Sequence, residues 1–252
     1  MSGGAGHDRG LGGDCVATRL LAWDSDFYGF PVASLEVSPG GAPALAAELQ
    51  ALRKRGVVLC YCRTAVDDEE ASACLRGLQA SLVDEKVMFV RAVDAGERRA
   101  GALALTSYLG RALTPELLLL ALQSGEFSRF RTDPRLPAGS FERMYETWMR
   151  RSLSGELAQE VLCSTARGVE TGVVTLARQG GTATIGLLAV APEVRGQGVG
   201  SALLAEAAAC CARWGVAELL VATQRTNAAA CGLYTKSGFC VKTAERIYHA
   251  WL

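Results

Sequence analysis

The chain has 252 residues and a formal net charge of zero, which allows one or two domains and excludes a strongly basic surface for nucleic acid or anionic membranes. No apolar run reaches the length of a membrane span, and the first residues lack the apolar core of a secretion signal, so we expect a cytoplasmic protein. Only four of the 26 basic residues are lysine and alanine is abundant, a bias typical of GC-rich bacterial genes.

Nine cysteines leave open a disulfide scaffold, a metal site or isolated thiols. The pairs Cys60-Tyr61-Cys62 and Cys210-Cys211 lack the Cys-x-x-Cys spacing typical of zinc and redox sites. The other cysteines stand alone among mostly apolar neighbours: Cys15, Cys74, Cys163, Cys231 and Cys240. We therefore predict structural thiols in a reducing cytosol, and no metal.

The N-terminal half alternates strand and helix patterns. Residues 1–15 are rich in glycine and predict a disordered tail. Apolar runs predict strands and amphipathic segments predict helices, with strands at 16–23, 32–37, 57–63 and 83–93 and helices at 42–54 and 67–80. This half has no phosphate-binding loop, so we assign a domain at 16–110 to acceptor recognition or scaffolding.

A break near residues 105–113 predicts the start of a second domain at 114–252. Its first helix covers 114–123, where Thr114 is a suitable N-cap and Pro115 a suitable first helical residue. A second helix at 141–153 and antiparallel strands at 160–165 and 172–177 follow.

A glycine-rich hexamer, Arg195-Gly196-Gln197-Gly198-Val199-Gly200, then lies between the apolar run 184–190 and a helical pattern at 201–214. Strand, glycine-rich turn and helix favour a phosphate cradle, because backbone N–H groups attract anions and missing side chains let a ligand approach. The third glycine comes too early for a dinucleotide-binding G-x-G-x-x-G, and no lysine follows for a Walker loop. The alternative is an ordinary tight turn into a helix.

A second motif follows the next predicted strand, 218–223. Asn227 is a suitable helix N-cap and Gly238 a suitable C-terminal cap. Asn227 and Tyr234 are seven residues apart and therefore fall on nearly the same helix face. The alternative roles are a simple cap for Asn227 and a core aromatic for Tyr234.

The two motifs resemble signatures of the GNAT acyltransferase superfamily, Arg/Gln-x-x-Gly-x-Gly/Ala and Asn-x-x-Ala-x-x-x-Tyr-x-x-x-Gly-Phe. The resemblance implies an α/β (α+β) GNAT fold with a central, mixed and strongly twisted sheet, here with a smaller N-terminal α/β domain. It implies acetyl-CoA as the acyl donor, Tyr234 as the general acid, and the Val190 N–H facing the thioester carbonyl oxygen. It also implies a set of residues that bind acetyl-CoA: Leu188, Ala189, Val190, Arg195, Gly196, Gln197, Gly198, Val199, Gly200, Ser201 and Asn227.

Proton transfer sets two requirements for this chemistry. A phenol has a pKa of about 10 and a thiol about 8.5, so Tyr234 must donate its proton as the C–S bond breaks, or the site must lower its pKa. No general base is identified, because His7 lies in the glycine-rich tail and His249 at the end of the last predicted strand. A solvent channel is one alternative, and the carboxylates are candidates by residue type alone: Asp24, Asp26, Glu126 and Glu170.

Three further stretches, 21–30, 83–87 and 128–135, look like those of the TDP-fucosamine acetyltransferases (dTDP-4-amino-4,6-dideoxy-D-galactose N-acetyltransferases). This resemblance implies a nucleotide-linked amino sugar as the acceptor. Ser128, Arg129 and Arg131 are the candidate substrate residues, because arginine binds diphosphates through paired hydrogen bonds. The alternative is that the arginines pair with Asp133 or Glu126 in a rigid surface turn.

We therefore predict an N-acyltransferase that moves an acetyl group from acetyl-CoA to an amino sugar carried on a nucleotide, without metal or nucleic acid, and that forms a homodimer. The alternatives are another small amine, a protein N-terminus as acceptor, or a module that binds acyl-CoA without catalysis.

Overall fold

The computed structural model describes residues 16–97 and 103–252, so the predicted tail at 1–15 lies outside the described residues. The chain forms two compact units, Val83–Ile247 and a unit that joins the described part of Met1–Leu82 to Tyr248–Leu252. The units therefore divide at Leu82, and not near 105–113 as the sequence predicts. The reason is that the strand beginning at Ser81 pairs with the strand at Glu218–Gln224, far along the chain.

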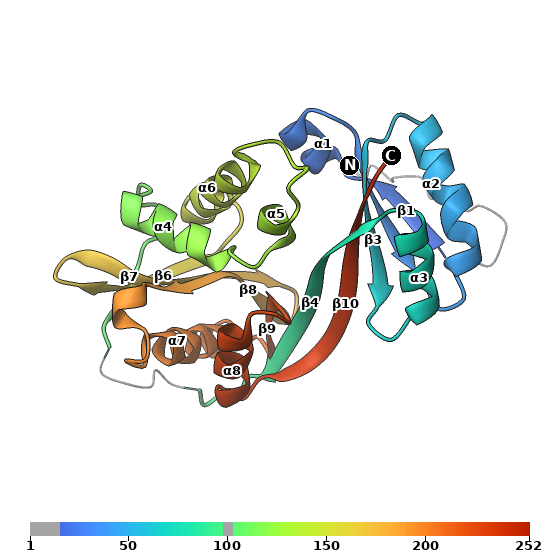
Figure 1. Ribbon diagram of the computed structural model, residues 1–252. Helices are drawn as coiled ribbons and strands as arrows, with labels where there is room; N and C mark the ends of the chain where they lie inside the picture. The colour runs from blue at the N-terminus through green and yellow to red at the C-terminus, as the bar shows by residue number, and fades with distance from the viewer. Residues whose placement is uncertain (1–15, 98–102) are drawn as a thin grey trace, which may run out of the picture. The chain divides into compact units, whose positions relative to one another are not determined.

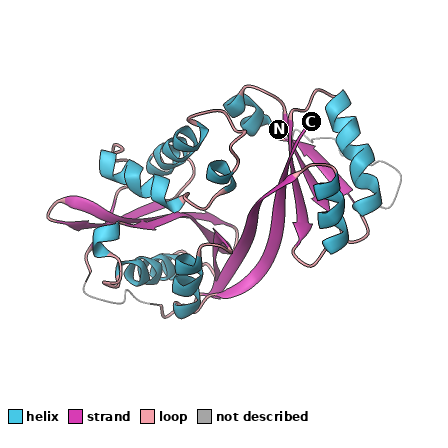
Figure 2. Cartoon of the chain, viewed as in Figure 1, coloured by secondary structure: helices cyan, strands magenta, loops and turns pink. Residues whose placement is uncertain are grey.

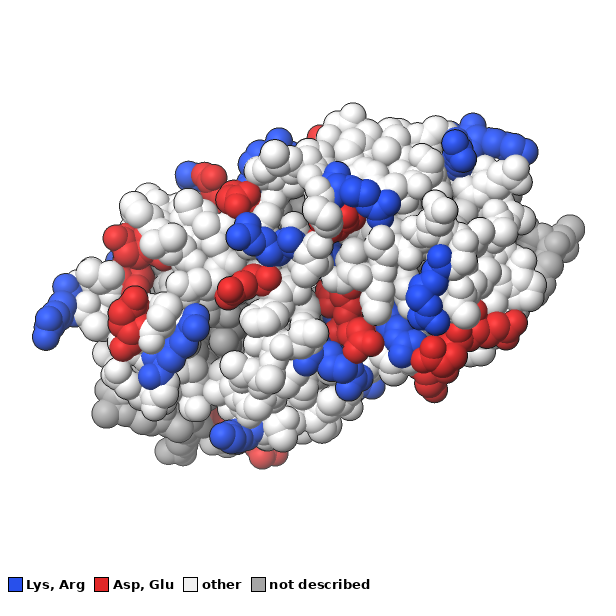
Figure 3. Space-filling view, viewed as in Figure 1, with Lys and Arg blue, Asp and Glu red and all other residues white. Residues whose placement is uncertain are grey.

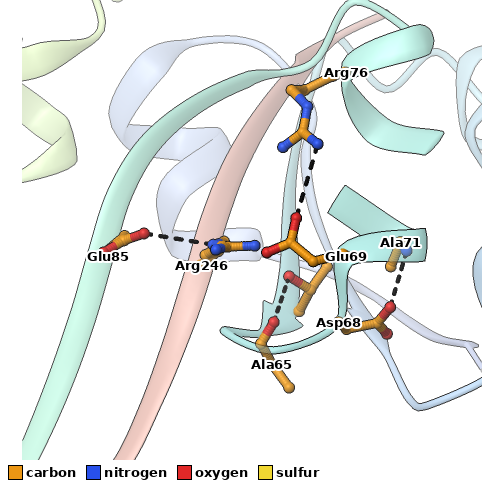
Figure 4. A network of polar contacts seen from close by, with 8 residues as sticks. Ala65, Asp68, Glu69, Ala71, Arg76, Glu85 and Arg246 are labelled. Atoms are coloured by element: carbon orange, nitrogen blue, oxygen red, sulfur yellow. Dashed lines mark hydrogen bonds and ion pairs between the residues drawn. The ribbon is translucent and has the colours of Figure 1, made fainter. Parts of the chain in front are cut away.

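The N-terminal unit contains a sheet of order β1-β2-β3-β10, covered by short helices (Figure 1). Strands β1 and β2 are antiparallel and β2 and β3 are parallel. Asp68 caps α3 by accepting a 2.9 Å hydrogen bond from the Ala71 amide (Figure 4). The elements are β1 (Val16–Leu20), α1 (Ala22–Tyr28), β2 (Val32–Val37), η1 (Ala42–Ala44), α2 (Leu45–Lys54), β3 (Leu59–Ala65), α3 (Glu69–Gly77) and the end of β10 (Cys240–Trp251).

The strand predicted at 16–23 is wrong in its last residues, because β1 ends at Leu20 and α1 begins at Ala22. Trp23 and Phe27 are four residues apart in α1 and stack with ring centroids 5.1 Å apart. Helical spacing brings such rings together. The other strands and helices predicted in this unit occur close to the expected ranges.

The C-terminal unit contains a mixed sheet of order β10-β4-β9-β8-β7-β6-β5. Strands β8 and β9 are parallel, whereas β4 pairs antiparallel with β9 and β7 pairs antiparallel with β8. The strands are β4 (Ser81–Ala92), β5 (Leu105–Ser107), β6 (Glu160–Ala166), β7 (Val169–Gln179), β8 (Thr182–Val190) and β9 (Glu218–Gln224). This architecture confirms the predicted fold class.

Helices cover both faces of this sheet (Figures 1 and 2). On one face are α7 (Val199–Arg213) and α8 (Ala228–Lys236), and a short 3-10 helix, η2 (Pro192–Val194), precedes α7. On the other face are α4 (Pro115–Ser124), α5 (Arg129–Thr132) and α6 (Ser140–Leu153). Thr114 caps α4 as predicted, since its hydroxyl accepts a 3.2 Å hydrogen bond from the Leu117 amide.

Acidic and basic side chains alternate over the face shown in Figure 3, in agreement with the zero net charge. None of the helices in the described part of the chain is long and apolar enough to cross a membrane.

Candidate active site

An opening in the sheet between β8 and β9 forms the first part of the site. The two strands pair from Thr182↔Glu218 to Ile185↔Val221, and the pairing stops there. Strand β9 continues to Gln224, where it pairs with β4. Within the described chain, the rest of β8 has a strand partner only on its β7 side. The predicted residues Leu188, Ala189 and Val190 lie on this segment, so its backbone is available to a ligand on the β9 side.

A β-bulge in β8 lies at the start of this opening. Leu188 pairs with Val174 and Ile185 with Leu176, so Gly186 and Leu187 together oppose the single residue Thr175. The Leu187 amide donates a 2.9 Å hydrogen bond to the Thr175 hydroxyl, which satisfies a backbone group that the bulge displaces.

The loop before α7 forms the second part of the site. Gly196 and Gly198 have φ angles of 77° and 83°, in the left-handed region that favours glycine. The amides of Arg195 and Gln197 donate hydrogen bonds within the loop, to Pro192 and Val194. The remaining amides of the loop and first helical turn have no acceptor among the described residues: Gly196, Gly198, Val199, Gly200 and Ser201. These donors lie at a helix N-terminus and suit a phosphate ligand.

Side chains hold this loop in place. Arg195 Nε donates a 3.0 Å hydrogen bond to the Val190 carbonyl oxygen and so connects the loop to the end of β8. Gln197 Nε2 donates to the Glu193 carbonyl oxygen at 3.2 Å. A Cβ on Gly200 would lie 3.0 Å from Leu233 Cδ2, so glycine lets α7 and α8 approach closely here.

Helix α8 carries the second sequence motif. The Asn227 side chain accepts a 3.1 Å hydrogen bond from the Ala230 amide, so it is a helix cap, and its amide group remains available as a donor. Tyr234 is 4 % exposed, and its ring centroid lies 5.5 Å from that of Phe89 and 5.8 Å from that of Phe239. The Tyr234 ring is therefore part of the core.

Burial raises the pKa of Tyr234 well above its ordinary value. No hydrogen bond joins its hydroxyl to another of the described residues. Two routes for proton donation follow from the sequence: a lowered pKa of Tyr234, or proton transfer during C–S cleavage. The described residues do not lower the pKa of Tyr234. Proton transfer from Tyr234 then requires that the proton move as the C–S bond breaks.

The structure separates the three candidate substrate residues. Ser128 is buried at the start of α5, and Arg129 lies close enough to Asp84 for its charge to lower the pKa of that carboxyl. Arg131 points to α6, where it forms an exposed ion pair with Glu142 at 3.5 Å. Ser128 is therefore buried and Arg129 half-buried near Asp84, whereas Arg131 forms its ion pair at the surface.

Asp84 on β4 is a candidate site residue that the sequence reasoning missed. It is 6 % exposed, and its Oδ2 accepts a 3.4 Å hydrogen bond from Gln224 Nε2. Burial raises the pKa of Asp84 to about 6, although Arg129, Gln224 and Lys86 each lower it. The available signal was an aspartate at an inward position of a predicted strand.

Comparison with known proteins identifies the part of the chain that contains these features. Residues 124–239 match the family model of the acetyltransferase (GNAT) family. This segment is a GNAT acetyltransferase domain. It includes the loop before α7, Asn227 and Tyr234. The match covers 116 of the 252 residues, and the family is one of acyl-CoA-dependent N-acetyltransferases.

Solved structures share the fold of the GNAT domain and of the rest of the chain. A GCN5-related N-acetyltransferase from Sphaerobacter thermophilus has a TM-score of 0.62 at 19% identity, over 94% of this chain and 76% of that one. A functionally unknown conserved protein from Staphylococcus epidermidis has a TM-score of 0.63 at 13% identity, over 96% and 93%. The glucosamine N-acetyltransferase region of a fungal β-N-acetylglucosaminidase has a TM-score of 0.55 at 14% identity, over 93% and 31%. A comparison with curated proteins gives no match.

The general-base candidates chosen by residue type are dispersed. Asp24, Asp26 and His249 belong to the N-terminal unit, and His7 lies outside the described residues. In the GNAT domain, Glu126 is exposed after α4. Glu170 on β7 lies beside Tyr108 and raises its pKa.

Two buried cysteines of the described residues, Cys163 and Cys210, are poor nucleophiles. The cysteines in the described residues are free, and burial raises the pKa of both Cys163 and Cys210 to about 12. A thiol with such a pKa is almost fully protonated at neutral pH and is a poor nucleophile.

Proposed function

We propose that the GNAT domain transfers the acetyl group of acetyl-CoA to the primary amine of a nucleotide-linked amino sugar, by direct attack and with Tyr234 as general acid. The observation that carries the donor side is the group of unpaired amides at Gly196 and from Gly198 to Ser201, which suits the pyrophosphate of CoA. The amides beside the β8–β9 opening suit the peptide-like arm of the same molecule, because they lack a strand partner there.

In this proposal the chain positions the thioester with its backbone. Leu188 and Val190 bind the arm of CoA, and the Val190 N–H faces the carbonyl oxygen on which negative charge develops. Arg195 Nε donates a hydrogen bond to the Val190 carbonyl oxygen and so fixes this peptide segment. A prealigned amide of this kind contributes a few kcal/mol to stabilising an oxyanion, typically about 3 kcal/mol.

The assignment of the acceptor is based on the polar residues around Ser128 and Arg129. Arg129 supplies a cation next to the opening, and a diphosphate or sugar hydroxyl is a suitable partner. The resemblance to TDP-fucosamine acetyltransferases supports an amino sugar, as does the likeness to the fungal glucosamine N-acetyltransferase region. The N-terminal unit then serves acceptor recognition or scaffolding.

The test is incubation of the purified protein with acetyl-CoA and a panel of nucleotide-linked 4-amino sugars, free amino sugars, polyamines and peptides with free N-termini. Released CoA and product mass are measured. Acetylation of a nucleotide-linked amino sugar in preference to the others supports the proposal. Preference for a polyamine or peptide, or binding of acetyl-CoA without turnover of any sugar, contradicts the acceptor assignment.

A further inference from the structure

Asp84 has one carboxylate oxygen that the protein leaves without a partner. Its Oδ2 accepts the hydrogen bond from Gln224, whereas Oδ1 is buried and has no hydrogen-bond partner among the described residues. A buried carboxylate oxygen in this state costs free energy, and most such atoms in folded proteins are paired. An unpaired buried oxygen is typical of a site that a ligand completes.

The surroundings of Asp84 are polar on several sides. Arg129 of α5 is the cation with the largest effect on it, followed by Lys86 on the same strand, while Glu245 of β10 and Tyr145 of α6 are the other titratable groups that interact with it. Helix α5 is attached directly to β4, because the Thr132 hydroxyl donates a 2.8 Å hydrogen bond to the Val83 carbonyl oxygen. Asp84 therefore lies under α5, beside Arg129.

The same group lies at the opening of the sheet. Gln224, the donor to Asp84, is the last residue of β9, and parallel strands β8 and β9 have their carboxyl ends at the same edge. Tyr145 stacks on Trp148 with centroids 5.9 Å apart, and a Cβ on Gly186 in the β8 bulge would lie 3.4 Å from Trp148 Nε1. Ligands of open α/β sheets bind beyond the carboxyl ends of such strands.

We propose that Asp84 takes the proton from the ammonium group of the acceptor, with Gln224 orienting the carboxylate. This inference rests on the proposed function only in requiring an amine acceptor. Of the three ammonium protons, one passes to Asp84 Oδ1 and then to solvent, one ends on the CoA sulfur through the general acid, and one stays on the amide nitrogen. The C–N bond forms and the C–S bond breaks, so the products are an amide, free CoA and one proton.

The carboxylates next to Asp84 are already engaged. Glu85 forms ion pairs with Arg225 at 3.2 Å and with Arg246 at 3.4 Å, the second of which Figure 4 shows. Glu245 pairs with Lys86 at 3.2 Å. The pKa of Asp84, about 6, keeps it ionised at neutral pH and makes it a stronger base than an ordinary aspartate.

The test compares Asp84→Asn with the matched control Asp94→Asn, an exposed aspartate of the same unit. The acceptor is whichever amine of the panel the wild type acetylates, so a failed sugar assignment leaves this test intact. We expect kcat/KM of the wild type to rise with pH through about 6, and Asp84→Asn to lose about 100-fold or more together with that dependence, with acetyl-CoA affinity unchanged. Asp94→Asn is expected to match the wild type.

A second acceptor separates proton transfer from a structural role. An O-alkyl hydroxylamine is uncharged at neutral pH and needs no base, so Asp84→Asn is expected to lose less than about 5-fold with it. Gln224→Met removes a hydrogen bond that lowers the pKa of Asp84, so the rise in kcat/KM is expected at higher pH. Full activity of Asp84→Asn with the ammonium acceptor, or equal losses with both acceptors, overturns the proposal. If Asp84→Asn does not fold, the test rests on Gln224→Met. An unchanged pH profile of kcat/KM in Gln224→Met then overturns the proposal.

Discussion

Replacement of Tyr234 by phenylalanine separates its packing from its chemistry. The ring contacts with Phe89 and Phe239 remain in this variant, and only the hydroxyl is lost. The hydroxyl makes no hydrogen bond to the described residues and is not among the fully buried, unpaired side-chain oxygens, so its loss removes little stabilisation. We therefore expect Tyr234→Phe to unfold at about the same urea concentration as the wild type.

The same substitution is expected to lower turnover if Tyr234 is the general acid. The loss is about 100-fold in kcat, which corresponds to about 2.7 kcal/mol in the activation free energy. The assay is steady-state release of CoA with the best amine of the panel, alongside acetyl-CoA binding by calorimetry. Tyr108→Phe is the control, since Tyr108 is also buried but lies beside Glu170. Unchanged kcat in Tyr234→Phe, with normal acetyl-CoA binding, would show that the tyrosine serves packing alone.

Three other predictions follow from contacts in the GNAT domain and the adjoining β4. Gly125→Ala places a Cβ 2.1 Å from Tyr145 Cζ and must displace that ring, so urea unfolding is expected to show a loss of about 3 kcal/mol; a loss below about 1 kcal/mol contradicts this packing. Asn227→Ala and Thr114→Ala each remove a helix cap, and each is expected to lower the free energy of unfolding by about 1 kcal/mol. Only Asn227→Ala should also weaken acetyl-CoA binding in calorimetry. If both variants bind acetyl-CoA equally well, Asn227 is a helix cap alone. The pKa of Asp84 is about 6 in the folded state and 3.8 as the reference, so the folded state binds the extra proton. The free energy of unfolding should therefore rise by about 2 kcal/mol as the pH falls from 7 to 4. Urea titrations in which Asp84→Asn keeps the wild-type slope against pH would refute this assignment.

The donor side of the site could be predicted from sequence because its chemistry is local. The hexamer at 195–200 and the motif from Asn227 to Phe239 each lie within one turn or one helix, and a helix N-terminus with glycines needs no distant residue to expose its amides. The predicted caps at Thr114 and Asn227 are present for the same reason.

The acceptor side could not be predicted because it depends on residues far apart in the chain. The environment of Asp84 is set by Gln224 and by Arg129, which come from β9 and α5. A strand pattern indicates that Asp84 faces inward but not what faces it. The helix at Ala22–Tyr28 was missed because aromatic residues favour strands, whereas Gly29, with a φ of 79°, ends a helix here.

The N-terminal unit has consequences for how the chain matures. Its core includes Tyr248, fully buried, and Ala250, although all its other buried residues precede Val83. During synthesis the strand segment that completes its core is made only after the whole of Val83–Ile247. Until then its partner strand β3 presents an unpaired edge, the kind of surface on which nascent chains misassemble. Folding of this unit is thus delayed until Val83–Ile247 has been made, and deletion of Tyr248–Leu252 would impair this unit first.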